Sequence, residues 1–168
     1  MPSNDSVVYA FRWNSKRKRP GRVISEKEAF SRWCSGEEFT VVVPSGAEKN
    51  FGTLVTFDLK NRHVITSFLD DQGRKYMEYT YRREGGSWLF LYLRNYWTYP
   101  NRDPDLDIDT AAKAEEALQA EDGYTRRVII DEVENMKETR EYRNVPVDGN
   151  WVQFPEFGEW GELARYDR

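Results

Sequence analysis

The chain has 168 residues, a formal net charge of −4 and 32% charged side chains. These values predict one soluble domain over residues 1–168 and exclude an intrinsically disordered chain. No run approaches the roughly 18 apolar residues of a membrane span, and no apolar leader is present, so we expect a cytoplasmic protein without a membrane partner.

The first part of the chain predicts a strand, a helix and a second strand. Residues 7–13 have strand composition. Ser25 and Glu28 then form a capping box, which predicts a short helix through about Cys34. The apolar, β-branched segment 38–43 predicts the next strand.

Residues 53–99 predict four consecutive antiparallel strands, a meander. Each segment is rich in β-branched and aromatic residues and is bounded by turn residues. Gly85 and Gly86 form a strong hairpin signal between the last two strands. The expected strands are residues 53–59, 63–69, 74–83 and 88–99.

The rest of the chain predicts a second helix, a hairpin and an aromatic tail. Residues 110–122 are rich in good helix formers, and residues 124–134 and 136–143 have the composition of paired strands. A short helix could begin near residue 159. The tail is expected to fold over one opening of the sheet through four aromatic side chains spaced three residues apart, Trp151, Phe154, Phe157 and Trp160.

The fold class that we expect is α+β, with one large, strongly curled antiparallel sheet and two short helices. A twisted sheet of about seven or eight strands tends to curl into a half-barrel or to close. The sequence therefore predicts a barrel-like cup, a shape that offers a concave binding surface.

The predicted strand 88–99 carries a cation within an otherwise apolar segment. Strict alternation places Arg94 on a face with aromatic residues and puts leucines on the other face. Arg94 either stacks on tyrosines at a solvated sheet end or anchors an anionic or carbonyl group of a ligand. The second interpretation gives as ligand-binding residues Phe90, Tyr92, Arg94, Asn95 and Tyr96, with Tyr79 and Tyr81 from the preceding strand.

The sequence contains few residues that could bind a metal or a cofactor or form a disulfide. One cysteine, Cys34, and one histidine, His63, allow no intrachain disulfide and no Cys/His metal cluster. Aspartates alternate over 103–109, but the segment lacks the central glycine and terminal glutamate of a calcium loop. No phosphate-binding glycine motif occurs. We therefore expect no metal and no cofactor.

Three side chains are weak candidates for acid/base catalysis. Asp131 shares a strand face with Ile129, so it is either an inward carboxylate or a strand end paired with an arginine. Glu78 lies across the hairpin from the neighbourhood of Arg94, at a register that the sequence does not define. His63 begins a strand, where a lone histidine is more often a surface residue.

Three functional hypotheses follow from these patterns. The first is a binding protein whose aromatic cup takes a small molecule or a peptide. The second is a toxin-neutralising immunity or inhibitor protein, which would use the acidic segment 103–122 against a basic protein partner. The third is a cofactor-free acid/base enzyme, such as a cyclase or isomerase, in the same cup. Residues 16–19 are all basic, but one short run in an acidic chain does not favour a nucleic-acid partner.

Overall fold

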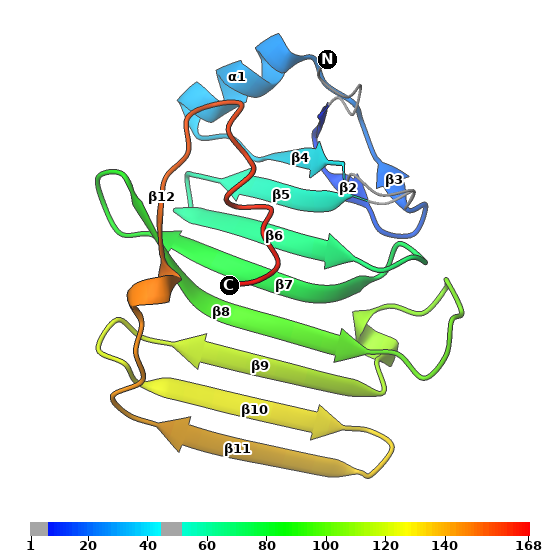
Figure 1. The fold of residues 1–168 in the computed structure, drawn as a ribbon. Helices are drawn as coiled ribbons and strands as arrows, with labels where there is room; N and C mark the ends of the chain where they lie inside the picture. Colours follow the sequence, from blue (N-terminus) through cyan, green and yellow to red (C-terminus); the bar gives the residue numbers. More distant parts are fainter. Residues whose placement is uncertain (1–6, 45–51) are drawn as a thin grey trace.

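A computed structural model describes residues 7–44 and 52–168, and in it nearly all strands form one antiparallel sheet (Figure 1). Its spatial order is β1-β4-β5-β6-β7-β8-β9-β10-β11, and β12 pairs separately with β8. The strands of this sheet are β1 (Val8–Ala10), β4 (Phe39–Val43), β5 (Thr53–Asp58), β6 (His63–Leu69), β7 (Lys75–Arg83), β8 (Trp88–Thr98), β9 (Lys113–Gln119), β10 (Thr125–Asp131), β11 (Met136–Tyr142) and β12 (Trp151–Gln153). A separate hairpin consists of β2 (Trp13–Asn14) and β3 (Arg19–Pro20).

The sheet is open, which corrects the predicted barrel-like cup. β1 and β11 lie at its two edges, and the sheet is neither closed nor strongly curled (Figure 1). From β4 to β11 each strand pairs with its neighbours in sequence. Such a meander grows by adding strands at one edge, and nothing in its pairing forces the first and last strands to meet. The meander predicted over residues 53–99 is present as β5 to β8.

The described residues contain one α-helix, α1 (Glu26–Ser35), where two helices were predicted. Ser25 accepts a hydrogen bond of 3.1 Å from the main-chain N–H of Glu28, and Gly36 ends the helix with a φ of 74°. The predicted helix and its Ser25 N-cap are thus confirmed, and the Glu28 carboxylate pairs with Arg22 at 3.1 Å. Two short 3-10 turns, η1 (Ile108–Thr110) and η2 (Asp148–Asn150), lie in connections. No helix in the described part of the chain is both long and apolar enough to cross a membrane.

The predicted helix at 110–122 is wrong, because most of this segment is strand β9. Its alanines and glutamates favour a helix locally, but as a strand it pairs with β8 on one side and β10 on the other. Glu115 and Glu116 also form ion pairs with Arg127 (2.6 Å) and Arg126 (3.5 Å) of β10. A helix with alanine as its main apolar residue would have buried little surface, whereas the strand satisfies backbone groups on both edges.

The hydrophobic core lies on one face of β4 to β8, the core face, beneath α1 and the C-terminal segment 154–168. This segment crosses β5 to β7 (Figure 1) and buries Trp160 and Leu163. Trp33 of α1 stacks on Phe154 with ring centroids 4.8 Å apart. The aromatic tail therefore covers the face of an open sheet instead of a barrel mouth, and turns replace the short helix predicted near residue 159.

Strands β9 to β11 extend the sheet beyond the region that the C-terminal segment crosses (Figure 1). Six of the seven residues of β11 are exposed, and most side chains of β9 and β10 are only half-buried. A sheet region this exposed on both faces is held mainly by backbone pairing and by contacts within each face. Its apolar side chains remain accessible to a partner.

Candidate functional site

A β-bulge in β8 divides the predicted ligand-binding residues between the two faces of the sheet. The pairing of β7 with β8 shifts between Leu91 and Leu93, which leaves Tyr92 without a partner on β7. One extra residue reverses the side-chain alternation beyond it. Arg94 therefore lies on the core face with Leu91, and the predicted face that joined Arg94 to Tyr92 is wrong.

The core face brings together four of the predicted residues, Tyr79, Tyr81, Arg94 and Tyr96. The guanidinium carbon of Arg94 lies 5.8 Å from the centroid of the Tyr79 ring. Burial, with a smaller contribution from Tyr96, raises the pKa of Tyr79 to about 12. Burial also lowers the pKa of Arg94 from its ordinary value, an effect that the neighbouring tyrosines oppose.

The side-chain amides of Gln119 and Asn150 position the guanidinium of Arg94 through hydrogen bonds. Its guanidinium donates to Oε1 of Gln119 and, at 3.1 Å, to Oδ1 of Asn150. The buried Asn150 side chain donates in turn to the main-chain oxygen of Leu91 at 2.8 Å and to Oε1 of Gln119 at 2.9 Å. Among residues 7–44 and 52–168, Arg94 forms no ion pair, and two of its five N–H groups have an acceptor.

The C-terminal segment closes over these tyrosines. The hydroxyl of Tyr79 donates to the main-chain oxygens of Tyr166 at 2.8 Å and Arg168 at 3.3 Å. Tyr81 is fully buried, and its hydroxyl has no hydrogen-bond partner within the described parts of the chain. A buried hydroxyl without a partner lowers the stability of the fold by roughly 1–3 kcal/mol. A group that hydrogen-bonds to the Tyr81 hydroxyl would remove this cost.

The other three predicted ligand residues lie on the opposite, outer face. Phe90 packs on Trp151 with ring centroids 4.8 Å apart. Tyr92 lies 5.9 Å from the ring of His63, one of the acid/base candidates. Asn95 lines a cleft further along the strand. The residues expected to form one site thus occupy both faces of the sheet.

The two carboxylate candidates for catalysis also lie on opposite faces. Glu78, on the outer face, accepts hydrogen bonds from Ser67 at 2.7 Å and Lys75 at 2.6 Å. Asp131, on the core face, accepts from two main-chain N–H groups of the following turn and pairs with Lys113 at 3.7 Å. Asp131 is therefore the last residue of its strand and is paired with a cation, which is one of the two predicted arrangements. The cation is a lysine instead of the expected arginine. The structure does not assemble these candidates into one constellation.

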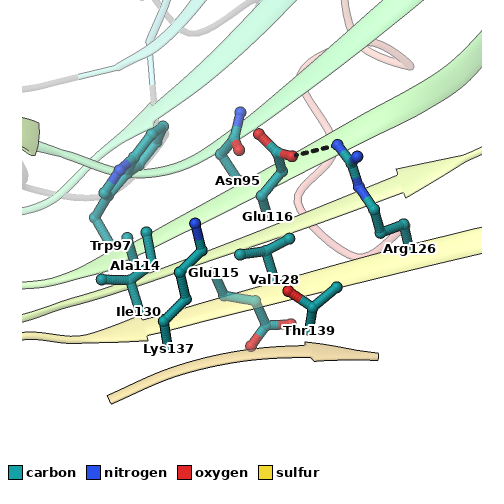
Figure 2. Close-up of a pocket in the computed structure, with 10 residues that line it drawn as sticks. All are labelled: Asn95, Trp97, Ala114, Glu115, Glu116, Arg126, Val128, Ile130, Lys137 and Thr139. Atoms are coloured by element: carbon teal, nitrogen blue, oxygen red, sulfur yellow. Dashed lines mark hydrogen bonds and ion pairs between the residues drawn. The ribbon is translucent and has the colours of Figure 1, made fainter. Parts of the chain in front are cut away.

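An open cleft of about 500 Å³ lies on the outer face of β8 to β11 (Figure 2). This volume falls in the range of known ligand sites. Its apolar part consists of four half-buried side chains, Trp97, Ala114, Val128 and Ile130. Polar and charged residues complete the lining, namely Asn95, Glu115, Glu116, Arg126, Lys137 and Thr139, although the side chain of Glu115 lies on the core face, where it pairs with Arg127. We call this surface the Trp97 cleft.

The charged groups of the Trp97 cleft are accessible. Glu116 and Arg126 form the ion pair seen in Figure 2, and Lys137 forms none in the described part of the chain. An exposed pair of this kind contributes little to stability, so a partner can compete for either charge. Of the cleft residues, only Asn95 was predicted to bind a ligand. Val128 and Ile130 share one face of a predicted strand, which could have indicated an apolar surface. The helix predicted at 110–122 concealed it, because Ala114 was not expected to lie in a strand between Trp97 and Ile130.

An acidic loop follows β8 directly. Residues 103–109 contain four exposed aspartates, none of which forms an ion pair with a described residue. The loop is nevertheless fixed in place, because the buried Arg74 donates to the main-chain oxygens of Asn101 at 2.8 Å and Asp103 at 3.0 Å. Asp107 caps η1 within the loop. The result is a block of negative charge at the end of the sheet where β8 meets β9.

Within the described residues, no group of three or more His, Cys, Asp or Glu side chains is placed to hold a metal ion.

The chain matches no family model, no curated protein and no solved structure. Its function must therefore be inferred from the chemistry of its own surfaces, and the Trp97 cleft and the acidic loop are neighbours on that surface.

Proposed function

We propose that this protein is a binding module for a basic polypeptide segment that carries an apolar side chain. The Trp97 cleft receives the apolar side chain, and the acidic loop attracts the cations that flank it. The observation that carries this proposal is an uncovered apolar floor of β8 to β10 beside a fixed loop of unpaired aspartates. An apolar centre with a polar rim is the usual composition of a protein-binding surface.

The shape of the cleft favours a polypeptide over a small molecule. The cleft is open and lies on the outer face, whereas the C-terminal segment 154–168 covers the core face, so the cleft does not enclose a ligand. Pockets that bind small molecules tightly bury most of the ligand surface. A polypeptide can instead extend beyond the cleft and contact the acidic loop at the same time.

Charge would decide which polypeptides bind. The carboxylates of Asp105 and Asp109 form no hydrogen bond with the described residues, so both are available to a partner's cations. Complementary charge mainly accelerates association and rejects partners of the wrong sign. Since these groups are exposed, their contribution should weaken as salt concentration rises.

Peptide display against the purified protein tests the proposal. Selected peptides should combine Lys or Arg with at least one large apolar residue. Trp97→Ala should weaken their binding by about 2 kcal/mol, roughly thirtyfold, because a central tryptophan is a typical hot spot. Trp88→Ala is the matched control. It removes an exposed indole from the same strand, about 30 Å away, and should leave affinity unchanged.

The charge component has its own test. The double variant Asp105→Asn/Asp109→Asn should slow association and flatten its salt dependence, while Asp107 still caps η1. Selection of acidic or neutral peptides would contradict the proposal. So would a set of peptides whose binding does not change in Trp97→Ala.

A small anionic molecule at Arg94 is a second candidate ligand. Three N–H groups of Arg94 have no acceptor among the described residues. A carboxylate or phosphate group would accept from them. Thermal melts of wild type and Arg94→Met with acetate and with phosphate test this candidate. An anion-dependent rise in Tm that only the wild type shows would support it, and equal responses would reject it.

A further inference from the structure

The β2–β3 hairpin contains a second large cavity, which is separate from the Trp97 cleft. Its volume is about 700 Å³, and Phe11, Arg12, Trp13, Lys16 and Arg22 are among its lining residues. These residues come from the N-terminal part of the chain and share no strand with β8 to β11. The proposed function therefore does not use this cavity.

Positive charge around this cavity is almost uncompensated. Residues 12–22 include six Lys and Arg and no Asp or Glu, although the whole chain has a net charge of −4. Within the described parts of the chain, Arg22 is the only one of these six that forms an ion pair, with Glu28 at 3.1 Å. Like charges held this close repel one another unless an anion neutralises them.

Backbone hydrogen bonds fix the main chain that carries Arg12 and Arg22. The N–H of Phe11 donates to the main-chain oxygen of Arg22 at 2.8 Å, and the N–H of Gly21 donates to that of Arg12 at 2.9 Å. A Cβ atom at position 21 would lie 3.2 Å from the same Arg12 oxygen, so glycine permits this close pairing. Backbone hydrogen bonds thus hold the two ends of the lining, residues 11–12 and 21–22, and Trp13 and Asn14 belong to β2.

Trp13 supplies a flat apolar wall to the cavity. Its side chain is half-buried and stacks on no aromatic ring among the described residues. The ring of Phe11, in contrast, is already covered by the guanidinium of Arg32 at 4.6 Å. An unstacked indole beside cations is the combination with which many proteins bind nucleotides, since the base stacks on the ring and the phosphate contacts the cations.

We propose that the β2–β3 cavity binds a nucleotide, with its base on Trp13 and its phosphate between Arg12, Lys16 and Arg22. The nucleotide is either free in solution or an unpaired unit of single-stranded nucleic acid. The overall acidity of the chain argued against a nucleic-acid partner, but the hairpin concentrates its positive charge locally. Recognition of this kind depends on local potential more than on net charge.

Fluorescence anisotropy of a labelled ten-residue oligothymidylate, together with calorimetric titration of AMP and ATP, tests the proposal on the full chain. Trp13→Leu should weaken binding about tenfold or more, because stacking is lost while apolar bulk remains. Arg12→Gln/Lys16→Gln should weaken binding and reduce its salt dependence. Trp88→Leu and Lys27→Gln remove an exposed indole and an exposed cation elsewhere and should change neither property. Circular dichroism confirms that each variant is folded.

The outcomes separate the possible ligands. Oligothymidylate binding that depends on Trp13 and exceeds that of AMP identifies single-stranded nucleic acid as the source, whereas tight AMP or ATP binding without an oligomer advantage identifies a free nucleotide. The proposal is overturned if Trp13→Leu binds as wild type does, or if pyrophosphate competes as well as AMP. It is also overturned if vesicles of phosphatidylserine and phosphatidylcholine bind while the oligomer and nucleotides do not.

Discussion

Arg94 and Asn150 are joined by a hydrogen bond of 3.1 Å although 56 positions separate them in the sequence. Asn150 belongs to η2, where the chain returns from the β11 edge to pair β12 with β8. Its side chain also bonds to the Leu91 main chain and to Gln119. Arg94 therefore links η2 to the middle of the sheet through its hydrogen bond to Asn150.

Replacing this cation should destabilise the fold. Arg94→Met keeps most of the aliphatic bulk but leaves Oδ1 of the buried Asn150 without its donor. We expect a loss of about 1–3 kcal/mol in the free energy of unfolding, measured by urea titration. Arg126→Met removes an exposed ion pair with Glu116 and should cost well under about 1 kcal/mol. Unchanged stability in Arg94→Met would show that the network does not support the fold.

Tyr81 and Tyr79 offer a matched pair of substitutions. Tyr81→Phe removes a buried hydroxyl with no partner among the described residues, so stability should hold or rise by up to about 1 kcal/mol. Tyr79→Phe removes a hydroxyl that donates to Tyr166 at 2.8 Å and should cost about 1 kcal/mol. Equal losses in the two variants, measured by thermal and urea unfolding, would indicate that Tyr81 has a partner such as a buried water.

Local signals predicted α1 and the β5 to β8 meander because the determining residues are close in sequence. Ser25 and Glu28 specify the helix start within one turn, and Gly85 lies in the tight connection that forces β7 and β8 to pair. Residues 110–122 misled the prediction, since their helix propensity is local while the pairing that makes β9 a strand comes from both neighbouring strands.

The candidate sites were harder to predict because they depend on one bulge and on long-range pairing. No glycine or proline marks the bulge at Tyr92, yet it moves Arg94 to the core face. The Trp97 cleft lies on strands that follow one another in the chain, but its lining depends on their register, which pairs Trp97 with Ala114 and Ala114 with Ile130. Register of this kind is set by tertiary pairing, which composition does not reveal.

Alkaline pH should destabilise the protein through its buried tyrosines. Burial raises the pKa values of Tyr79 and Tyr99 to about 12 each, against an ordinary value of about 10. In this range the unfolded chain ionises its tyrosines while the folded chain keeps these two protonated. The stability that they contribute is complete below about pH 10 and is lost as the pH rises to about 12. Urea unfolding at a series of alkaline pH values should show this decline.

Variants identify the tyrosine responsible for the decline. Tyr79→Phe should reduce the slope of stability against pH, whereas Tyr166→Phe, which removes a side chain that is 70% exposed, should not. Absorbance of tyrosinate in the folded protein provides an independent measurement. If Tyr79→Phe left both the slope and the absorbance titration as in the wild type, Tyr79 would not be the group that titrates late.

Arg74 should control the order of the acidic loop. Its side chain is 6% exposed, bonds to Asp70 at 2.8 Å and lies over the ring of Tyr99 at 4.2 Å. Its remaining N–H groups hold the first residues of the loop. Arg74→Met leaves the partly buried Asp70 without its cation, which should cost up to about 3 kcal/mol in the free energy of unfolding. The loop also loses its main attachment to the sheet.

Trypsin should detect the loosened loop, because Arg102 lies directly before residues 103–109 and pairs only with the exposed Asp71 among the described residues. Cleavage after Arg102 should be much faster in Arg74→Met than in wild type under conditions where both are folded. Lys60→Met, which removes an exposed cation elsewhere, should leave the rate unchanged.

Basic peptides should also associate more slowly with Arg74→Met than with the wild type, because the aspartates remain but are no longer held in one arrangement beside the Trp97 cleft. Slower cleavage, or unaltered peptide association, would show that the loop does not depend on Arg74 for its presentation.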